Sequence, residues 1–573
     1  MLTPKKLIRS CEDTSIMLIG GANVYALSIL MLLLISAPIH ACTSFIITPL
    51  ASADNSMYLG YSNDALSVGT MKYIPPADHP KGSKRAIPFD QWSSGAKALN
   101  GSKIAYIDEV SHTYGYLTSS YGIMNEHQLM IGEGSSLTKT LQDYDSRKRI
   151  FFSSELSKII LERCTKSKQA VELAGLLIDT YGYYGVGETL LFADPKEGWV
   201  MEMCSSPNGT GGLWVAKRVP DGDIFVSANT FRIREIDPED HNLQYSRNLF
   251  QVAEAQEWWR PEAGPLDWMK IVCTGEDSHP YSSLARVWSI YHRFACSLNL
   301  SPYVEDAWSK DYPFSAKPDR KLRMQDALNV LRDHYEGTVY DMTKGLAAGP
   351  YGNPYRDPGI YDFSSDVVRG NASRGAWSRP VSSFQCMYSY VAQGRTNLPD
   401  PIGGVCWFGF AQPFETCYMP IYCGVRDIPK EFGKGNMSVF DPTSPWWIFN
   451  FVTNWATLRY DDMKKDIQSE QARIEDREIT LQPKLDRRAE EILNTGGPEA
   501  CSQYLTDYSI NNSLSVLNDW QKLANRLVVK YTCGMVKDPS SGQYHPKGYP
   551  NWWLNETGYH YGPRTYGYSE LQQ

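Results

Sequence analysis

The sequence predicts an α+β protein in which strands and helices form separate layers, followed by a helical extension. From Cys42 to about residue 229, short apolar or alternating runs are broken by Gly, Asn and Asp, which is typical of strands and turns. Two segments with apolar residues at helical spacing, Ser153–Arg163 and Ala170–Ile178, interrupt these strands. Strands, two helices and then more strands indicate layers packed against one another.

Residues 1–41 have the pattern of a segment that is removed from the mature chain. Basic residues between Lys5 and Arg9 precede the apolar run Val24–Ser36, and Ala41 supplies a small residue at the cut. The apolar run is shorter than the roughly 20 residues of a membrane span. We therefore expect a secreted or periplasmic protein with no stable membrane span after cleavage.

The main domain is predicted over residues 42–445. Its first strands are expected at Tyr114–Tyr121, Leu129–Ile131, Thr189–Ala193, Trp199–Met203, Leu213–Ala216 and Ile224–Ala228. Residues 230–380 are mixed, with helical stretches near 242–258 and 321–336 and a Gly/Pro-rich loop at 345–358. A second strand-rich block runs from Val381 to Arg426.

The remaining chain differs from the main domain in residue composition and periodicity. Residues 446–535 predict a helical extension packed on the main domain, because Asp461–Asn494 is charged and helix-forming and Val516–Val529 is amphipathic. Residues 536–573 are rich in Gly, Tyr and Trp, and we expect them to form a tail along the surface.

Composition and motifs exclude several functions. The chain of 573 residues has a net charge of -8 and no basic stripe, so nucleic acid is not an expected partner. Glycine-rich phosphate loops, the His-Glu-x-x-His pattern and paired Cys-x-x-Cys spacing are missing from the sequence, so we expect no metal and no cofactor. The sequence leaves the oligomeric state open.

The junction between Ala41 and Cys42 suggests a specific chemistry. If the chain is cut there, Cys42 carries both a thiol and a free α-amine. A free thiol has a pKa of about 8.5 and an α-amine one of about 7.7 to 8.0, so the neutral amine can take the thiol proton directly or through one water. One residue can then supply both nucleophile and base.

Two further side chains suit acyl transfer, which also needs a site for negative oxygen. Asp64 could accept a hydrogen bond from the α-ammonium of Cys42, and the Asn229 amide could donate to an oxyanion. Taken alone, Asp64 is more often a turn residue and Asn229 more often a strand-end cap. Cys42 alone is also explained as a buried cysteine or a lipid attachment point.

Seven ordered motifs resemble the C69 dipeptidase family, which belongs to the N-terminal nucleophile hydrolases. The motifs are Cys42–Thr43, the turn Asp54–Ser56, Asn63–Asp64, Gly132–Ser135, Gly198–Glu202, Trp214–Asp221 and Ala228–Ile233. The resemblance implies a four-layer αββα sandwich, in which two antiparallel sheets pack between helices. It also implies that Cys42 is the nucleophile, Asp64 lies near the α-amine and Asn229 lies on the oxyanion side.

The implied activity is that of a cysteine dipeptidase, whose pocket should hold both charged ends of a dipeptide. Glu133 or Glu202 is the predicted partner of the substrate amine, and Arg232 or Arg234 that of its carboxylate. The chain has Tyr61 where the family usually has an arginine. Tyrosine carries no permanent positive charge, so either Arg232 or Arg234 substitutes for that arginine or activity is altered.

Three alternatives stay open at this point. The first is that the substrate is a different amide, of the bile-salt or penicillin type. The second is that the chain keeps the fold without catalysis, which Tyr61 favours. The third is a surface lipoprotein or binding protein acylated on Cys42, because Ile39–Cys42 loosely fits a bacterial lipid-attachment box. His40 is an awkward residue for that box, and a strand-like run follows Cys42 where lipoproteins usually have a flexible linker.

Overall fold

A computed structural model describes residues 42–90, 101–141, 144–207, 209, 211–274, 282–304, 308–355 and 379–559. The predicted removable segment 1–41 lies outside the described residues, as do 356–358 of the Gly/Pro-rich loop and 560–573 of the tail.

The first sheet has seven strands in the order β18-β14-β1-β2-β19-β20-β21. These are β18 (Ser315–Ala316), β14 (Ile224–Ser227), β1 (Thr43–Ile47), β2 (Met57–Asp64), β19 (Cys386–Gly394), β20 (Val405–Phe410) and β21 (Met419–Tyr422). Strand β1 pairs antiparallel with β2, with Thr43 opposite Ser62 and Phe45 opposite Gly60. This register places Cys42, one residue before β1, at the Asp64 end of β2.

The second sheet has eight strands in the order β16-β13-β12-β11-β10-β9-β8-β3. These are β16 (Leu243–Tyr245), β13 (Gly212–Arg218), β12 (Gly198–Ser205), β11 (Gly187–Ala193), β10 (Met130–Ser136), β9 (Gly122–Asn125), β8 (Tyr116–Thr118) and β3 (Lys72–Ile74). Short pairs lie outside the two sheets: β4 (Ala77–Asp78) with β7 (His112–Thr113), β5 (Lys84–Pro88) with β6 (Lys103–Asp108), β15 (Glu235–Ile236) with β17 (Leu266–Asp267), and β22 (Met535–Lys537) with β23 (Tyr544–Pro546).

Two hydrophobic cores arise because side chains alternate across the second sheet. Leu191 and Val200 point into the core shared with β1 and β2. Their neighbours Leu190 and Trp199 point the other way, into a core shared with the two helices that follow β10. The alternation explains why both faces of this sheet are apolar and covered.

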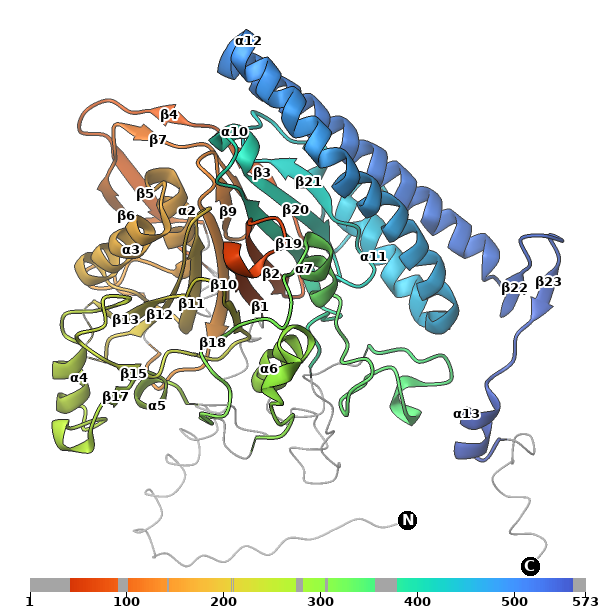
Figure 1. Cartoon of the computed structure of the whole chain (residues 1–573), viewed down its shortest axis with the longest axis horizontal. Coiled ribbons are helices and arrows are strands. Elements are labelled where there is room, and N and C mark those ends of the chain that lie inside the picture. The colour runs from red at the N-terminus through yellow and green to blue at the C-terminus, as the bar shows by residue number, and fades with distance from the viewer. Residues whose placement is uncertain are drawn as a thin grey trace, which may run out of the picture. The chain divides into compact units, whose positions relative to one another are not determined.

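The layers follow the order helix, sheet, sheet, helix (Figure 1). Helices α2 (Ser153–Arg163) and α3 (Ser167–Tyr181) cover the second sheet, whose strands β10 and β11 pack on β1 and β2. Helices α6 (Ser282–Phe294), α7 (Met324–Val330) and α11 (Pro445–Ala456) contact the first sheet. The predicted αββα sandwich and its two early helices are therefore confirmed.

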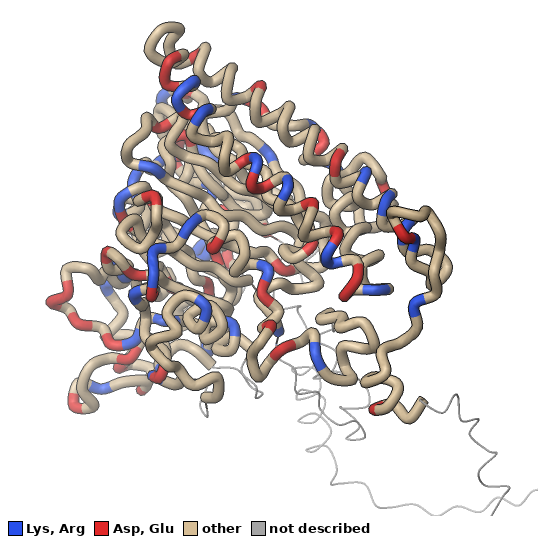
Figure 2. Tube along the Cα trace, turned by 45° about the vertical axis from the view of Figure 1, so that its right-hand side comes forward, with Lys and Arg blue, Asp and Glu red and all other residues tan. Residues whose placement is uncertain are grey.

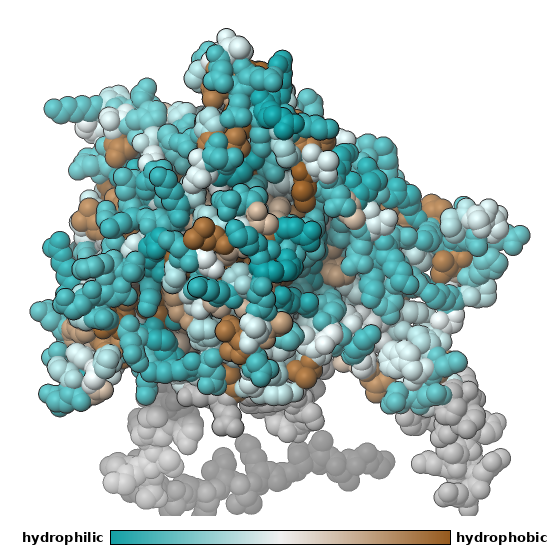
Figure 3. All heavy atoms as spheres, viewed as in Figure 1, coloured by the Kyte–Doolittle hydropathy of each residue, from teal (hydrophilic) through white to brown (hydrophobic). Residues whose placement is uncertain are grey.

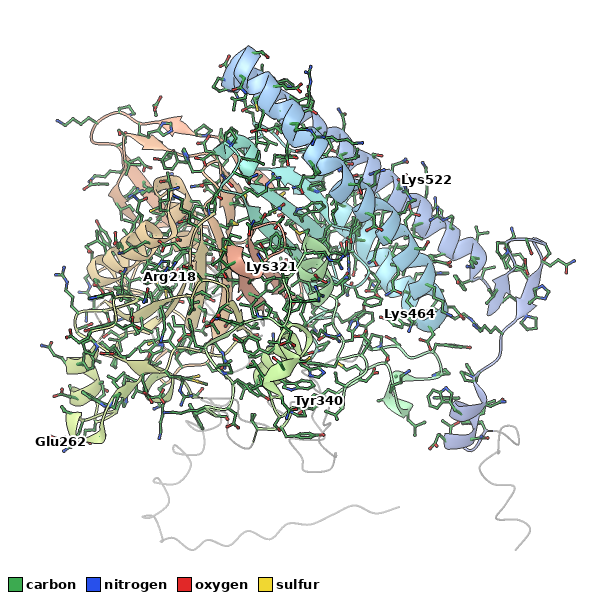
Figure 4. All side chains as sticks on the ribbon, in the orientation of Figure 1. Arg218, Glu262, Lys321, Tyr340, Lys464 and Lys522 are labelled. Atoms are coloured by element: carbon green, nitrogen blue, oxygen red, sulfur yellow. The ribbon has the colours of Figure 1, made fainter. Side chains whose placement is uncertain are left out.

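The helical extension is dominated by α12 (Tyr460–Lys530), which packs on α11 and β21. Gly497, with φ 80° and ψ -179°, interrupts the helix and divides it into two arms. Glycine suits this conformation because it has no Cβ. Charges of both signs follow α12 in Figure 2, and Lys522, labelled in Figure 4, has a side chain that is 61% exposed.

Two predicted helices are shorter than expected. In the 242–258 segment, β16 comes first and α4 covers only Leu249–Ala255. In the 321–336 segment, α7 ends at Val330. Tyr335 adopts a left-handed φ of 64°, which is incompatible with a right-handed α-helix. The other helices are α5 (Trp268–Val272), α10 (Asp400–Gly403) and α13 (Asn551–Glu556).

The six predicted early strands lie in or overlap β8 and β10 to β14, although Tyr114–Tyr121 contributes only the three residues of β8. The face shown in Figure 3 is largely hydrophilic, with small separate groups of hydrophobic residues. Within the described ranges, no helix combines the length and hydropathy that crossing a membrane requires.

Candidate active site

Cys42 lies between the two sheets and is 1% exposed. Its thiol donates a hydrogen bond to Oε1 of Glu133, on β10 of the facing sheet, at 3.1 Å. The Tyr61 hydroxyl, on β2, lies 3.5 Å from the same sulfur. Two groups from different sheets therefore contact the candidate nucleophile.

A buried arginine, Arg286 on α6, holds the backbone around Cys42. Its guanidinium donates to the Cys42 carbonyl oxygen at 2.9 Å and to Oγ1 of Thr43 at 3.0 Å. It also donates to the Ala228 carbonyl oxygen at 3.2 Å and to Oδ1 of Asn229 at 2.9 Å. The rigid fork of donors on an arginine suits such convergence, because a lysine offers only a single point charge. Arg286 thus ties β1 to the end of β14.

Asn229 sits at a sharp turn after β14, with a left-handed φ of 58°. Asparagine is one of the few residues with a side chain that tolerates this region. Its Oδ1 accepts from Arg286, which directs Nδ2 toward β10, where it donates to the Ser135 carbonyl oxygen at 2.7 Å. The structure therefore brings Asn229 to the Cys42 neighbourhood with its amide held at both ends.

Asp64, at the end of β2, pairs with Arg379 through Oδ2 and Nη2 at 2.9 Å. Burial raises the pKa of the Asp64 carboxyl, and the charges of Arg379 and Arg286 act in the opposite direction. Arg379 and Arg286 therefore supply positive charge beside Asp64.

Glu133 is bound to Tyr61 as well as to Cys42, since the Tyr61 hydroxyl donates to the same Oε1. On its other side lies Glu188 of β11, which accepts from the Ser153 hydroxyl at 2.7 Å and the Gly134 N–H at 3.1 Å. Burial raises the pKa of Glu133, while hydrogen bonds with Glu188, Tyr61 and Cys42 oppose that shift. Burial and the Glu133 charge raise the pKa of Glu188 well above its ordinary range.

The thiol of Cys42 is neutral in this environment. Burial raises its pKa well above the ordinary value, and the charges of Glu133 and Asp64 raise it further. A neutral thiol is a much weaker nucleophile than a thiolate.

Two cavities share Ala65, the residue after Asp64, in their walls. The first, of about 250 Å³, has charged walls contributed by Asp90, Glu133, Glu155 and Lys158. The second, of about 270 Å³, is lined by aromatic and amide side chains that include Tyr355, Phe384, Trp446 and Asn450. Glu133, whose Oε1 accepts from the Cys42 thiol, lines the first cavity, so this cavity is the candidate substrate pocket.

Three predicted site residues lie elsewhere. The Glu202 carboxylate accepts from the backbone N–H groups of Arg232 and Ile233, so it fixes a loop. Arg232 donates to the carbonyl oxygens of Tyr312 and Pro313, and Arg234 binds Asp267.

None of these three side chains lines the Glu133 cavity or contacts Cys42. The structure therefore does not place Arg232 or Arg234 at the position of the missing arginine. The arginines at the site are Arg379, which pairs with Asp64, and Arg286, which binds the Cys42 carbonyl oxygen. No local pattern in the sequence marked these two arginines.

Residues 41–473 match the model of peptidase family C69. The chain belongs to this family. The match confirms the expected family and, with it, the expected class of peptidase enzyme. It begins one residue before Cys42 and extends into the first arm of α12, so it includes every residue of the site described above.

Curated relatives are similar over much of their length. A probable dipeptidase of Salmonella dublin is 27% identical over 413 residues, which cover 69% of this chain and 84% of the relative. A probable dipeptidase of Latilactobacillus sakei is 24% identical over 411 residues, covering 69% and 76%. Dipeptidase A of Lactobacillus helveticus is 21% identical over 498 residues, covering 83% and 95%.

Among solved structures, a penicillin V acylase from Agrobacterium tumefaciens matches with a TM-score of 0.29 and 12% identity. The match covers 66% of this chain and 86% of that one.

Within the described ranges, no group of three or more His, Cys, Asp or Glu side chains is arranged to hold a metal ion.

Proposed function

We propose that this C69 family member is an exported cysteine dipeptidase that uses Cys42 as an N-terminal nucleophile. The observation that carries the proposal is the convergence of Glu133, Tyr61 and Arg286 on Cys42. Cleavage before Cys42 adds an α-amine beside the sulfur. The thiolate then attacks the peptide carbonyl, the amine carries protons to and from the reacting groups, and water releases the acyl group from sulfur.

The substrate-binding role falls to the charged cavity beside Glu133. Its volume of about 250 Å³ is slightly below the roughly 300 to 1,000 Å³ of sites for drug-sized ligands, which suits a substrate of two residues. The acidic wall with Asp90 and Glu133 would receive the substrate ammonium, and Lys158 its carboxylate. These assignments retain Glu133 from the sequence prediction and replace Arg232 and Arg234 by Lys158.

Asn229 is proposed as the donor to the oxyanion. Its anchoring by Arg286 and Ser135 supports this role, because a donor held in place before the reaction costs no reorganisation when charge develops.

Replacement of Cys42 by Ala tests the nucleophile. The chain should be produced so that it starts at residue 42, and hydrolysis of a panel of dipeptides should be compared with that of glycine- and taurine-conjugated bile salts and penicillin V. We expect dipeptide hydrolysis by the native chain and none by Cys42→Ala. A retained methionine before Cys42 should be nearly as damaging, because it removes the free amine.

Two results would redirect the proposal. Turnover of bile salts or penicillin V with inert dipeptides would assign the same site to a different amide, and dipeptide turnover by Cys42→Ala would exclude Cys42 as the nucleophile.

A further inference from the structure

The Tyr61 position, where the family usually has an arginine, is part of a hydrogen-bonded chain that crosses the gap between the sheets. Tyr61 and Cys42 both donate to Oε1 of Glu133, and Glu188 lies on the far side of the Glu133 carboxylate. The sulfur-to-oxygen distance of 3.1 Å is within hydrogen-bonding range, so a proton can move between them without any rearrangement.

We propose that Glu133, held in place by Tyr61, is a proton acceptor for the Cys42 thiol in addition to the α-amine of Cys42. The proposal deepens the proposed function, since it rests on Cys42 being the nucleophile. It makes Tyr61 a positioning residue rather than a sign of lost activity.

The proton and electron inventory balances with the groups present. The S–H bond of Cys42 breaks as an O–H bond forms on Oε1 of Glu133, and the electron pair left on sulfur forms a bond to the substrate carbonyl carbon. The C–N bond of the peptide then breaks, its electron pair stays on the leaving amine, and that amine receives a proton from Glu133 or from the α-ammonium. Water then attacks the acyl carbon and gives up a proton to the base. The C–S bond breaks, the sulfur recovers a proton, and the thiol is restored.

A second base has a physical reason. An α-amine with a pKa of about 7.7 to 8.0 is mostly protonated at and below neutral pH, so it accepts protons poorly there. A buried carboxylate in contact with the sulfur remains available, and the α-ammonium can then stabilise the thiolate by its charge. With Glu133 as the base and the α-ammonium as the stabilising charge, the enzyme would remain active below the pKa of the amine.

The surroundings of Glu133 favour one ionised carboxylate. Acids on either side are Asp64 and Glu188, and the tyrosines that face Glu133 are Tyr61, Tyr121, Tyr388 and Tyr390. Burial and the charge of Glu133 raise the pKa of Glu188 well above its ordinary range, which favours the neutral form of Glu188. Hydrogen bonds from Tyr61 and Cys42 to Oε1 then stabilise the charge on Glu133.

The test is the pH profile of kcat/KM for Glu133→Gln in the chain that starts at Cys42. We expect wild type to vary by about threefold or less between pH 6 and 8.5. The variant should depend on the α-amine alone, so its kcat/KM should fall by about tenfold per pH unit below pH 7.5. The pH-dependent part of the loss should appear in kcat. KM should rise at every pH, because Glu133 also lies in the wall proposed to receive the substrate ammonium.

Matched variants separate the proposed role from general damage. Glu478 on α12 is also buried and accepts from a tyrosine hydroxyl, that of Tyr508 at 2.5 Å, so Glu478→Gln should keep the wild-type profile. If Glu133→Gln does not fold, Tyr61→Phe provides the test. Removing that donor should move the acid side of the profile to higher pH. Tyr58→Phe, also on β2, loses a hydrogen bond to Asp54, which precedes the strand, and should not move the profile.

Two results would overturn the inference: a Glu133→Gln profile parallel to wild type, whether activity is kept or uniformly lowered, or a Tyr61→Phe profile that does not move. Failure of the proposed function is recognised separately, because wild type would then hydrolyse no dipeptide. In that case, alkylation of Cys42 by iodoacetamide, followed by mass, still reports on the contact. Glu133→Gln removes the carboxylate charge, so alkylation of Cys42 in the variant should begin at lower pH than in wild type. An unshifted pH dependence of alkylation would refute the inference.

Discussion

Replacement of Arg286 by Met is the most informative perturbation of the site's scaffold. The change removes a buried cation that donates to the Cys42 and Ala228 carbonyl oxygens and to Oδ1 of Asn229. Hydrogen bonds to charged groups contribute roughly 1.5 to 3 kcal/mol each, but the guanidinium no longer has to be desolvated. We therefore expect a net loss of about 2 to 4 kcal/mol in the free energy of unfolding.

The effect on catalysis should exceed the effect on folding. Without Arg286 the Asn229 amide loses the bond that orients it, and loss of one oxyanion donor typically costs about 10² to 10³ in kcat. We expect kcat for a dipeptide to fall about 100-fold with little change in KM. Arg286→Lys should be intermediate, because it keeps the charge without the fork of donors.

The assay pairs steady-state kinetics with urea unfolding, at a temperature where each variant is folded. Arg332→Met is the control, since the Arg332 side chain is only 10% exposed but binds Glu475 of α12. It should lower stability and leave kcat near wild type. If Arg286→Met kept kcat within about threefold of wild type, the assignment of Asn229 and its anchor to catalysis would be refuted.

Two further predictions concern the fold. A Cβ added at Gly60 would lie 2.1 Å from the Phe45 ring, so Gly60→Ala should destabilise the protein by about 1 to 3 kcal/mol, and Phe45→Leu should restore part of the loss in urea unfolding; equal stability of Gly60→Ala and wild type would contradict the register. Burial raises the pKa of Glu415 to about 7, so its contribution to stability is greatest below pH 4.5 and is lost as pH rises to 7. Glu415→Gln should abolish that decline and gain up to about 3 kcal/mol relative to wild type between pH 4 and 8, whereas parallel curves would contradict it.

Periodicity predicted the layers well because both faces of the second sheet are apolar. Leu190 and Leu191 lie in different hydrophobic cores. Helix α2 begins and ends at the residues where the apolar spacing begins and ends. Predictions were poorer for 321–336, where α7 stops at Val330. At Tyr335 the chain reverses with its backbone N–H donating to the Asp333 carboxylate at 2.8 Å. That carboxylate is held by Ser289 and Arg293 of α6, tertiary contacts that local spacing does not reveal.

The site was predictable only as far as its motifs. Cys42, Asp64, Asn229 and Glu133 are brought together, and each belongs to a motif that the sequence displays. Arg286 and Arg379 lie more than 200 residues from Cys42 along the chain and reach the site through α6 and the segment before β19, so no local pattern could assign them.

The intact mass and N-terminal sequence of the protein isolated from its producing cell test the central claim most directly. The account predicts a chain that starts at Cys42 with an unmodified amine and thiol, because both groups take part in the reaction. A chain that starts elsewhere, or one whose Cys42 carries a lipid that adds several hundred daltons, would contradict it.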